Sequence, residues 1–135
     1  MNPRPPRHAA ALGKLASPRL GRVFDRNRLF ELLDSWPDAP ALWLAAPPGA
    51  GKTTLVATWL RRRDEPMLWL QLDAADADPA TFMQSLDALW GSLLAAPLHL
   101  PPLRADDLAD LAGWLRRRLA HVLPLLPPRW SLVLD

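Results

Sequence analysis

The segment 46–54, with the sequence APPGAGKTT, constrains the fold of this chain more than any other part of it. An apolar run, ALWLAA at 41–46, leads into this segment, and a stretch beginning KTTLVATWL, with apolar residues at helical spacing, completes it. Six apolar residues bounded by prolines are too few for a typical buried helix but suit a parallel strand buried on both faces. A glycine-rich loop that leads from a strand into a helix can cradle phosphate groups. The sequence therefore predicts a phosphate-binding loop between a strand at 41–46 and a helix that begins at Lys52.

The residues of this loop have the chemistry that nucleotide phosphates require. Lys52 can reach the β- and γ-phosphate oxygens, Thr53 can place its hydroxyl on Mg²⁺, and Thr54 can bond the α-phosphate. The glycines let backbone N–H groups approach a polyphosphate closely. Ala46 replaces the first glycine of the usual G-x-x-x-x-G-K-[ST] pattern, so the early loop departs from it. We predict that ATP or ADP, bound with Mg²⁺, contacts Gly49, Ala50, Gly51, Lys52, Thr53 and Thr54.

Two further apolar segments, MLWLQL at 67–72 and WSLVL at 130–134, are as short as buried strands. Helical patterns separate the predicted strands, and strands joined by helical crossovers form parallel sheets with right-handed connections. We therefore predict an α/β fold, a three-layer P-loop NTPase of the ASCE type with an incomplete parallel sheet. Its strand order is 2-3-1, which places 130–134 between 67–72 and an edge strand at 41–45.

Carboxylate and amide side chains before the helical patterns predict where the helices begin. The predicted caps are Asp25 or Asn27, then Asp78 followed by Pro79, and finally Asp106 or Asp107. The helix after Asp78 is expected to run to about residue 94. In the last helix, the residues predicted to face the core are Leu108, Leu111, Leu115, Leu119 and Val122.

Asp135 ends the last predicted strand, at the carboxyl edge of the sheet where the phosphate loop is also expected. We predict that it holds Mg²⁺ through a water molecule, as a Walker B aspartate does. Residues 1–20, rich in proline and arginine, are predicted to be a flexible leader. Residues 21–135 would be the amino-terminal part of a nucleotide-binding domain, truncated after the Walker B strand. Its exposed edge strand would favour self-association.

Composition narrows the classes of function. The net charge of +2 gives no support to nucleic-acid binding by these residues. The chain has no cysteine, and its three histidines lack ligand spacing, so no thiolate or histidine metal site is predicted. Since no apolar run reaches the roughly 18 residues of a membrane span, and no secretory signal is visible, we expect a cytoplasmic protein without membrane contact.

Three groups of residues are interpreted as structural. The arginines at 61–63 and 116–118 close amphipathic helices, where cations are favoured and solvated. Asp73, Asp76 and Asp78 are expected to cap helices, because they lack the glycine turn and distal glutamate of a calcium loop. Core packing is assigned to Trp43, Trp59, Trp69, Trp90 and Trp114.

Four segments resemble the nucleotide-binding domain of STAND-type signalling ATPases, in particular MalT-like regulators with a carboxyl-terminal LuxR-type DNA-binding domain. They are SPRLGRVFDRNRLFELLD (17–34), LAAPPGAGKTTLVATWL (44–60), LWLQLDAADADPATFMQSL (68–86) and WSLVLD (130–135). The shared features are the non-glycine start of the loop, a tryptophan early in the next helix, and the pattern W-x-x-L-D...D-x-D-P-x-x-F. By position, the segment around Val23, Arg26 and Arg28 corresponds to the family's segment near the adenine, which adds Arg26 to the predicted nucleotide contacts.

The resemblance implies an ATP/ADP-binding switch. In this family ADP holds a closed monomer, whereas ATP with an inducer permits self-association and DNA binding. Contact with DNA would be made only by domains that this chain lacks, and slow ATP hydrolysis stays open because the acid that follows Asp135 in many ATPases is not in this chain. A small P-loop kinase or another NTPase fragment is the alternative, although a kinase has no need of the segment LDAADADPATF. A bare interaction fragment that does not fold is a further alternative.

Overall fold

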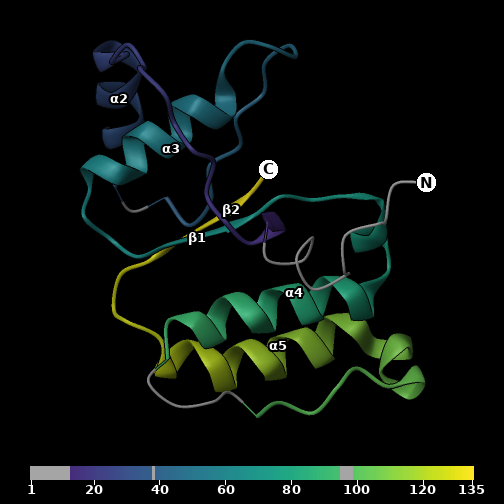
Figure 1. Ribbon diagram of the computed structural model, residues 1–135. Coiled ribbons are helices and arrows are strands. Elements are labelled where there is room, and N and C mark those ends of the chain that lie inside the picture. The colour runs from purple at the N-terminus through teal and green to yellow at the C-terminus, as the bar shows by residue number, and fades with distance from the viewer. Residues whose placement is uncertain (1–12, 38, 95–98) are drawn as a thin grey trace, which may run out of the picture. The chain divides into compact units, whose positions relative to one another are not determined.

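The computed structural model describes residues 13–37, 39–94 and 99–135 (Figure 1). The described chain divides into two compact units. Unit 1 contains residues 13–16 and the described part of 66–135, and unit 2 is Ser17–Glu65. Within the described residues, no helix is both long enough and apolar enough to cross a membrane.

Only the end of the predicted leader falls within the described part of the chain, since residues 1–12 lie outside it. Residues 13–16 belong to unit 1, where the Lys14 carbonyl accepts a hydrogen bond of 2.9 Å from the Gln71 N–H. Leu15 is half-buried against the core of this unit. Residues 13–16 therefore contact the core of unit 1, and the leader expected over 1–20 stays a prediction.

The sheet of unit 1 consists of β1 (Met67–Leu70) and β2 (Ser131–Leu134). The two strands are parallel, with Met67 opposite Ser131 and Leu70 opposite Leu134. Both strands lie where the sequence places them, and they are neighbours as expected. Their pairing satisfies the backbone N–H and C=O groups on the facing edges of two apolar segments that are far apart in the sequence.

Helices α4 (Pro79–Ser92) and α5 (Leu111–Val122) follow β1 in the chain and run beside one another (Figure 1), joined by a hydrogen bond from Arg118 to Asp87. The cap predicted for α4 is confirmed, because Asp78 Oδ2 accepts from the Thr81 N–H at 2.9 Å. The short 3₁₀ helices of this unit are η1 (Ala74–Ala77), η2 (Ala105–Asp110) and η3 (Leu123–Leu125).

The start predicted for the last helix is wrong. Residues 105–110 form η2, and α5 begins only at Leu111, with Asp110 as its cap through a 2.9 Å bond from the Gly113 N–H. Because η2 has three residues per turn, the helical spacing that was extended back to Leu108 does not hold there. Leu108 is 54% exposed, so its predicted burial is also wrong.

The core of unit 1 lies between the strands and the two helices. Its most enclosed side chains are Leu70, Trp90 and Val122. The buried cluster contains Leu68, Leu70, Met83, Leu86, Leu89, Trp90, Trp114, Val122 and Leu126. Core packing of Trp90 and Trp114, as the sequence predicts, is confirmed.

Unit 2 is built on α2 (Asn27–Asp34) and α3 (Lys52–Arg62). Their buried residues are Phe30, Leu33, Ala57 and Leu60. Helix α3 begins at Lys52, as predicted. Helix α2 has Arg26 at its cap position and no side-chain cap, so the caps expected from Asp25 or Asn27 are absent.

The apolar segment 41–46 is not in a strand in the structure. Trp43 is 94% exposed, which overturns its assignment to the core. A parallel strand needs a neighbour for its backbone N–H and C=O groups, and the described residues of unit 2 contain no other strand. The three-layer sheet with strand order 2-3-1 therefore stays a prediction, of which the structure contains the β1–β2 pair.

Candidate phosphate-binding site

The predicted phosphate loop is a tight turn that leads directly into α3. The Ala50 N–H donates to the Pro47 carbonyl at 3.2 Å, and the Gly51 carbonyl accepts from the Leu55 N–H at 2.9 Å. Gly49 and Gly51 both have a φ of 79°, in the left-handed region that favours glycine. The two glycines therefore allow the turn to deliver the chain into the first turn of α3.

Lys52 folds back across this loop from the first position of α3. Its Nζ donates to the Ala46 carbonyl at 2.8 Å and to the Pro47 carbonyl at 3.3 Å. Pro47 and Pro48 have no N–H groups, so the early loop offers acceptors rather than donors. The loop thus holds the lysine ammonium group against its own backbone.

Arg26 brings a second cation to the same loop. Its NH1 donates to the Ala50 carbonyl at 3.0 Å, across 24 residues of sequence. A Cβ atom at Gly51 would lie 2.9 Å from Arg26 NH2, so the guanidinium lies directly against the glycine. The Arg26 carbonyl accepts from the N–H groups of Leu29 and Phe30, which makes this residue the start of α2 as well. The position of α2 is therefore linked to the loop through a single residue.

Thr53 and Thr54 lie in the first turn of α3, where a helix presents N–H groups and the positive end of its dipole. The Thr54 carbonyl accepts a 2.7 Å bond from the hydroxyl of Thr58. All predicted nucleotide contacts from Gly49 to Thr54, with Arg26, thus lie in unit 2. Arrays of N–H groups, hydroxyls and two cations at a helix start are suited to an anionic, oxygen-rich ligand.

The predicted Mg²⁺ residue Asp135 lies in unit 1, directly after β2. Its N–H donates to the Leu70 carbonyl at 3.0 Å and its carbonyl accepts from the Leu72 N–H at 2.8 Å. Its side chain is exposed at the carboxyl end of the parallel pair. Thr53, the other predicted Mg²⁺ residue, belongs to unit 2, so a shared metal site stays a prediction. Within the described residues, no group of three or more histidine, aspartate or glutamate side chains could hold a metal ion.

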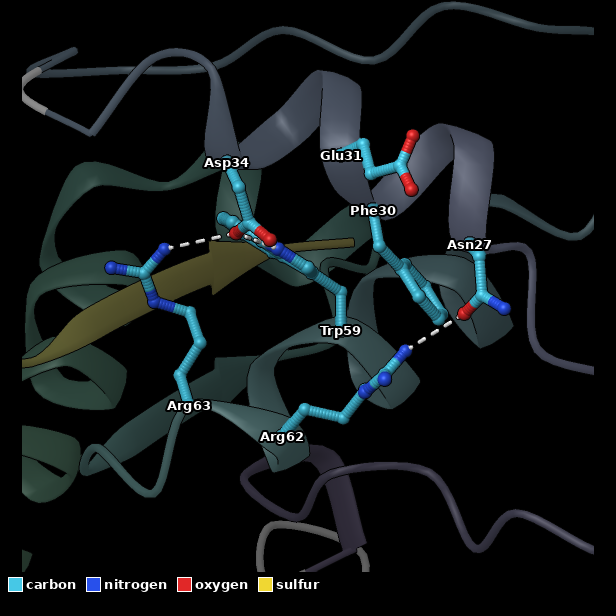
Figure 2. A pocket seen from close by; sticks show the side chains of 7 residues that line it. All are labelled: Asn27, Phe30, Glu31, Asp34, Trp59, Arg62 and Arg63. Atoms are coloured by element: carbon cyan, nitrogen blue, oxygen red, sulfur yellow. Dashed lines mark hydrogen bonds and ion pairs between the residues drawn. The ribbon is translucent and has the colours of Figure 1, made fainter.

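A cavity of about 500 Å³ lies between α2 and α3 (Figure 2). Its lining residues are Asn27, Phe30, Glu31, Asp34, Trp59, Arg62 and Arg63. Figure 2 shows Arg62 and Arg63 reaching from α3 towards α2 on either side of Trp59. Arg62 NH1 donates to Asn27 Oδ1 at 3.2 Å, and Arg63 NH1 lies 3.4 Å from Asp34 Oδ1.

Aromatic rings complete these contacts between the two helices. The Arg62 guanidinium lies 5.0 Å from the centre of the Phe30 ring, and that of Arg63 lies 5.1 Å from the Trp59 ring. The Trp59 Nε1–H donates to Asp34 at 2.8 Å. Arg62 and Arg63 lie at the end of α3, as expected, with Arg62 exposed and Arg63 half-buried, and both also contact α2. Their spacing from Trp59, i+3 for Arg62 and i+4 for Arg63, was the signal in the sequence.

The acidic residues after β1 act as helix caps, as the sequence predicts. Asp73 accepts from the Ala75 N–H at 2.8 Å and also pairs with Lys14 Nζ at 3.1 Å. The Ala75 bond, followed by the Lys14 bond, lowers the pKa of Asp73. Lys14 Nζ also lies 2.5 Å from Asp76 Oδ2, and although burial opposes the lysine charge, the hydrogen bonds to Asp76 and Asp73 raise the pKa of Lys14.

Comparison with known proteins relates part of the chain to a regulator of transcription. Over 75 residues, 54% of this chain, it is 39% identical to the HTH-type transcriptional regulator MalT of Vibrio cholerae. This similarity spans 8% of the length of that regulator. No protein-family model matches the chain, and no solved structure matches it. The similarity supports a MalT-like relationship for the matched residues.

Proposed function

We propose that unit 2 binds the phosphates of ATP or ADP, with Mg²⁺, as the switch module of a MalT-like, LuxR-type regulator of transcription. The observation that carries this proposal is the loop itself, in which two left-handed glycines lead into a helix start and two cations lie against the turn. Lys52 and Arg26 would exchange their carbonyl acceptors for phosphate oxygens, which are stronger acceptors because they are charged.

Mg²⁺ would be held by the phosphates and by the Thr53 hydroxyl, and Asp135 would contact it through water. Both residues carry the oxygen ligands that Mg²⁺ prefers. Within the proposal, the bound metal supplies positive charge to the phosphates. Occupancy by ATP or ADP then sets the switch state, with self-association as the response to ATP and DNA contact made elsewhere in such a regulator. A cytoplasmic location belongs to the same proposal.

The segment 41–46 would form the third strand of the sheet, beside β2. The segment is apolar, yet Trp43 is 94% exposed. A strand covered on both faces would bury such side chains, which supports this assignment. Hydrogen exchange measured with and without MgADP tests the assignment. Amide protons of 41–46 should become protected when MgADP is present, and exchange at unprotected rates in both conditions would count against the strand.

Calorimetry with MgATP and MgADP tests nucleotide binding. We expect Lys52→Ala to weaken binding by about 100-fold, because a charge-assisted contact to the phosphates is lost. Arg116→Ala, which removes an exposed arginine from α5, is the matched control and should bind like the parent chain. Circular dichroism of both variants should match the parent. Equal affinity of Lys52→Ala and the parent would refute the proposal.

The proposed metal contact has its own test. Asp135→Asn should weaken binding of Mg²⁺-nucleotide more than binding of nucleotide measured in excess chelator, because its partner is the water shell of the metal. Equal losses in the two conditions would assign Asp135 to structure instead.

A further inference from the structure

Unit 1 contains a second cavity, on the side of α5 that the chain segment 99–101 covers. Its volume is about 410 Å³, within the size range of pockets that hold small molecules. The lining residues are His99, Leu100, Pro101, Trp114, Arg117, Arg118 and His121. Four of them, from Trp114 to His121, are spaced at i, i+3, i+4 and i+7 and so share one face of α5.

Arg118 builds the wall of this cavity. Its side chain is 4% exposed and makes a two-pronged contact with the Asp87 carboxylate. Its NH1 donates to the Pro101 carbonyl at 2.7 Å, and its guanidinium lies 4.7 Å from the centre of the Trp114 ring. These contacts hold segment 99–101 against α5. The positive charge of Arg118 is neutralised by Asp87 inside the fold. The interpretation of this arginine as solvated is therefore wrong.

The remaining polar groups of the cavity are cationic or can donate hydrogen bonds. Arg117 pairs with Asp110 at 3.7 Å, and both side chains are about two-thirds exposed, so this pair is weak. Within the described residues, His99 and His121 have no hydrogen-bond partner, and both imidazoles can donate one. Among the residues that the structure describes, no carboxylate lines the cavity. A cation or a metal ion would meet Arg117 there without a compensating negative group.

We propose that this cavity binds a small organic anion with an apolar body. Its carboxylate or phosphate head group contacts Arg117 and the imidazoles of His99 and His121, and its body lies on Trp114 and Leu100. The site belongs to unit 1 and shares no residue with the phosphate loop, so it is independent of nucleotide binding in unit 2. The apolar wall distinguishes the preferred ligand from inorganic phosphate, which would leave that wall in water.

Proton NMR of the imidazoles tests this proposal on the full chain. The chain has three histidines, and two of them, His99 and His121, line the cavity. Benzoate and phenyl phosphate are the probes, and they separate a preference for carboxylate from one for phosphate. The signals of His99 and His121, assigned with His→Gln variants, should move together and saturate with one of these probes. Inorganic phosphate should bind about ten-fold more weakly than phenyl phosphate, because it lacks the apolar body.

Two neighbouring arginines of α5 provide a matched pair of variants. Arg117→Gln should lower the affinity for the better probe about ten-fold, since it removes a charged hydrogen-bond donor. Arg116→Gln, which does not line the cavity, should leave that affinity unchanged. The proposal is overturned if neither histidine signal responds to either probe, if Arg117→Gln binds like the parent, or if MgATP displaces the probe.

Discussion

Unit 1 and unit 2 bury their apolar residues to very different extents. In unit 1, strands and helices enclose side chains such as Leu70 and Val122 completely. In unit 2, two helices share a small core, while Phe24 is 93% and Trp43 94% exposed. The difference shows how much apolar surface each unit leaves for another segment or a ligand to cover. Unit 1 encloses the larger core, although Leu108 (54%) and Leu125 (52%) stay exposed, whereas unit 2 keeps an unpaired apolar segment immediately before the phosphate loop.

The arginines of the two units differ in the same way. Arg118 in unit 1 is buried and bound on both sides by Asp87 and Pro101, so the fold depends on it. Arg62 in unit 2 is exposed and contacts the neutral Asn27. A buried charge is costly to leave unpaired, whereas an exposed pair contributes little.

The largest effect is expected in the core of unit 1. Leu70→Ala should lower the free energy of unfolding by about 4 kcal/mol, because the fully enclosed site cannot collapse around the cavity. The matched variant in unit 2, Leu60→Ala, should cost only about 2 kcal/mol, since its partly exposed neighbours can relax. Urea unfolding followed by circular dichroism measures both. Equal losses would show that the two cores are equally well packed.

A smaller but still large loss is expected at the buried ion pair. Arg118→Ala should cost about 3 kcal/mol, because Asp87 is left partly buried without its partner. Arg116→Ala, an exposed neighbour, should change the free energy by less than about 0.5 kcal/mol. The double change Arg118→Met with Asp87→Leu should recover most of the loss, because no charge then remains unpaired. A loss that persists in the double variant would point to the Pro101 and Trp114 contacts instead.

The phosphate loop allows a comparison of two glycines with the same backbone conformation. Gly49→Ala should cost about 1 kcal/mol of stability through its left-handed φ alone, because nothing lies near the new methyl group. Gly51→Ala carries the same strain and also places its methyl group against Arg26, so it should cost about 2 kcal/mol. Thermal unfolding of the two variants measures the difference. Identical melting temperatures would mean that Arg26 moves away freely.

The smallest effect concerns acid pH and the caps after β1. Hydrogen bonds from Ala75 and Lys14 lower the pKa of Asp73, and those from Thr81 lower the pKa of Asp78. Carboxyls with a lowered folded pKa stabilise the fold above their unfolded pKa, near 4, and lose this contribution as the pH falls through the folded pKa. The melting temperature should therefore fall more steeply below about pH 4 in the parent than in Asp73→Asn/Asp78→Asn. If the two pH profiles were parallel, these carboxyls would make no contribution to the loss of stability in acid.

The amino-acid sequence by itself determined the elements that depend on near neighbours. The start of α3 at Lys52, the cap of α4 at Asp78 and the two apolar strands follow from periodicity and from side chains within a few positions. The glycines of the phosphate loop could also be predicted, because a left-handed backbone conformation in a turn favours glycine at that position itself.

Only the tertiary structure decided contacts between distant positions. It placed Arg26 on Ala50, 24 residues away, and Arg118 on Asp87, 31 residues away. The spacing of Trp114, Arg118 and Val122 indicates a buried face of α5, but it does not reveal which carboxylate neutralises the arginine. The exposure of segment 41–46 could not be predicted from its apolar residues either. An apolar run indicates that a segment can form a strand, but the strand forms only where the fold supplies a neighbour for its backbone hydrogen bonds.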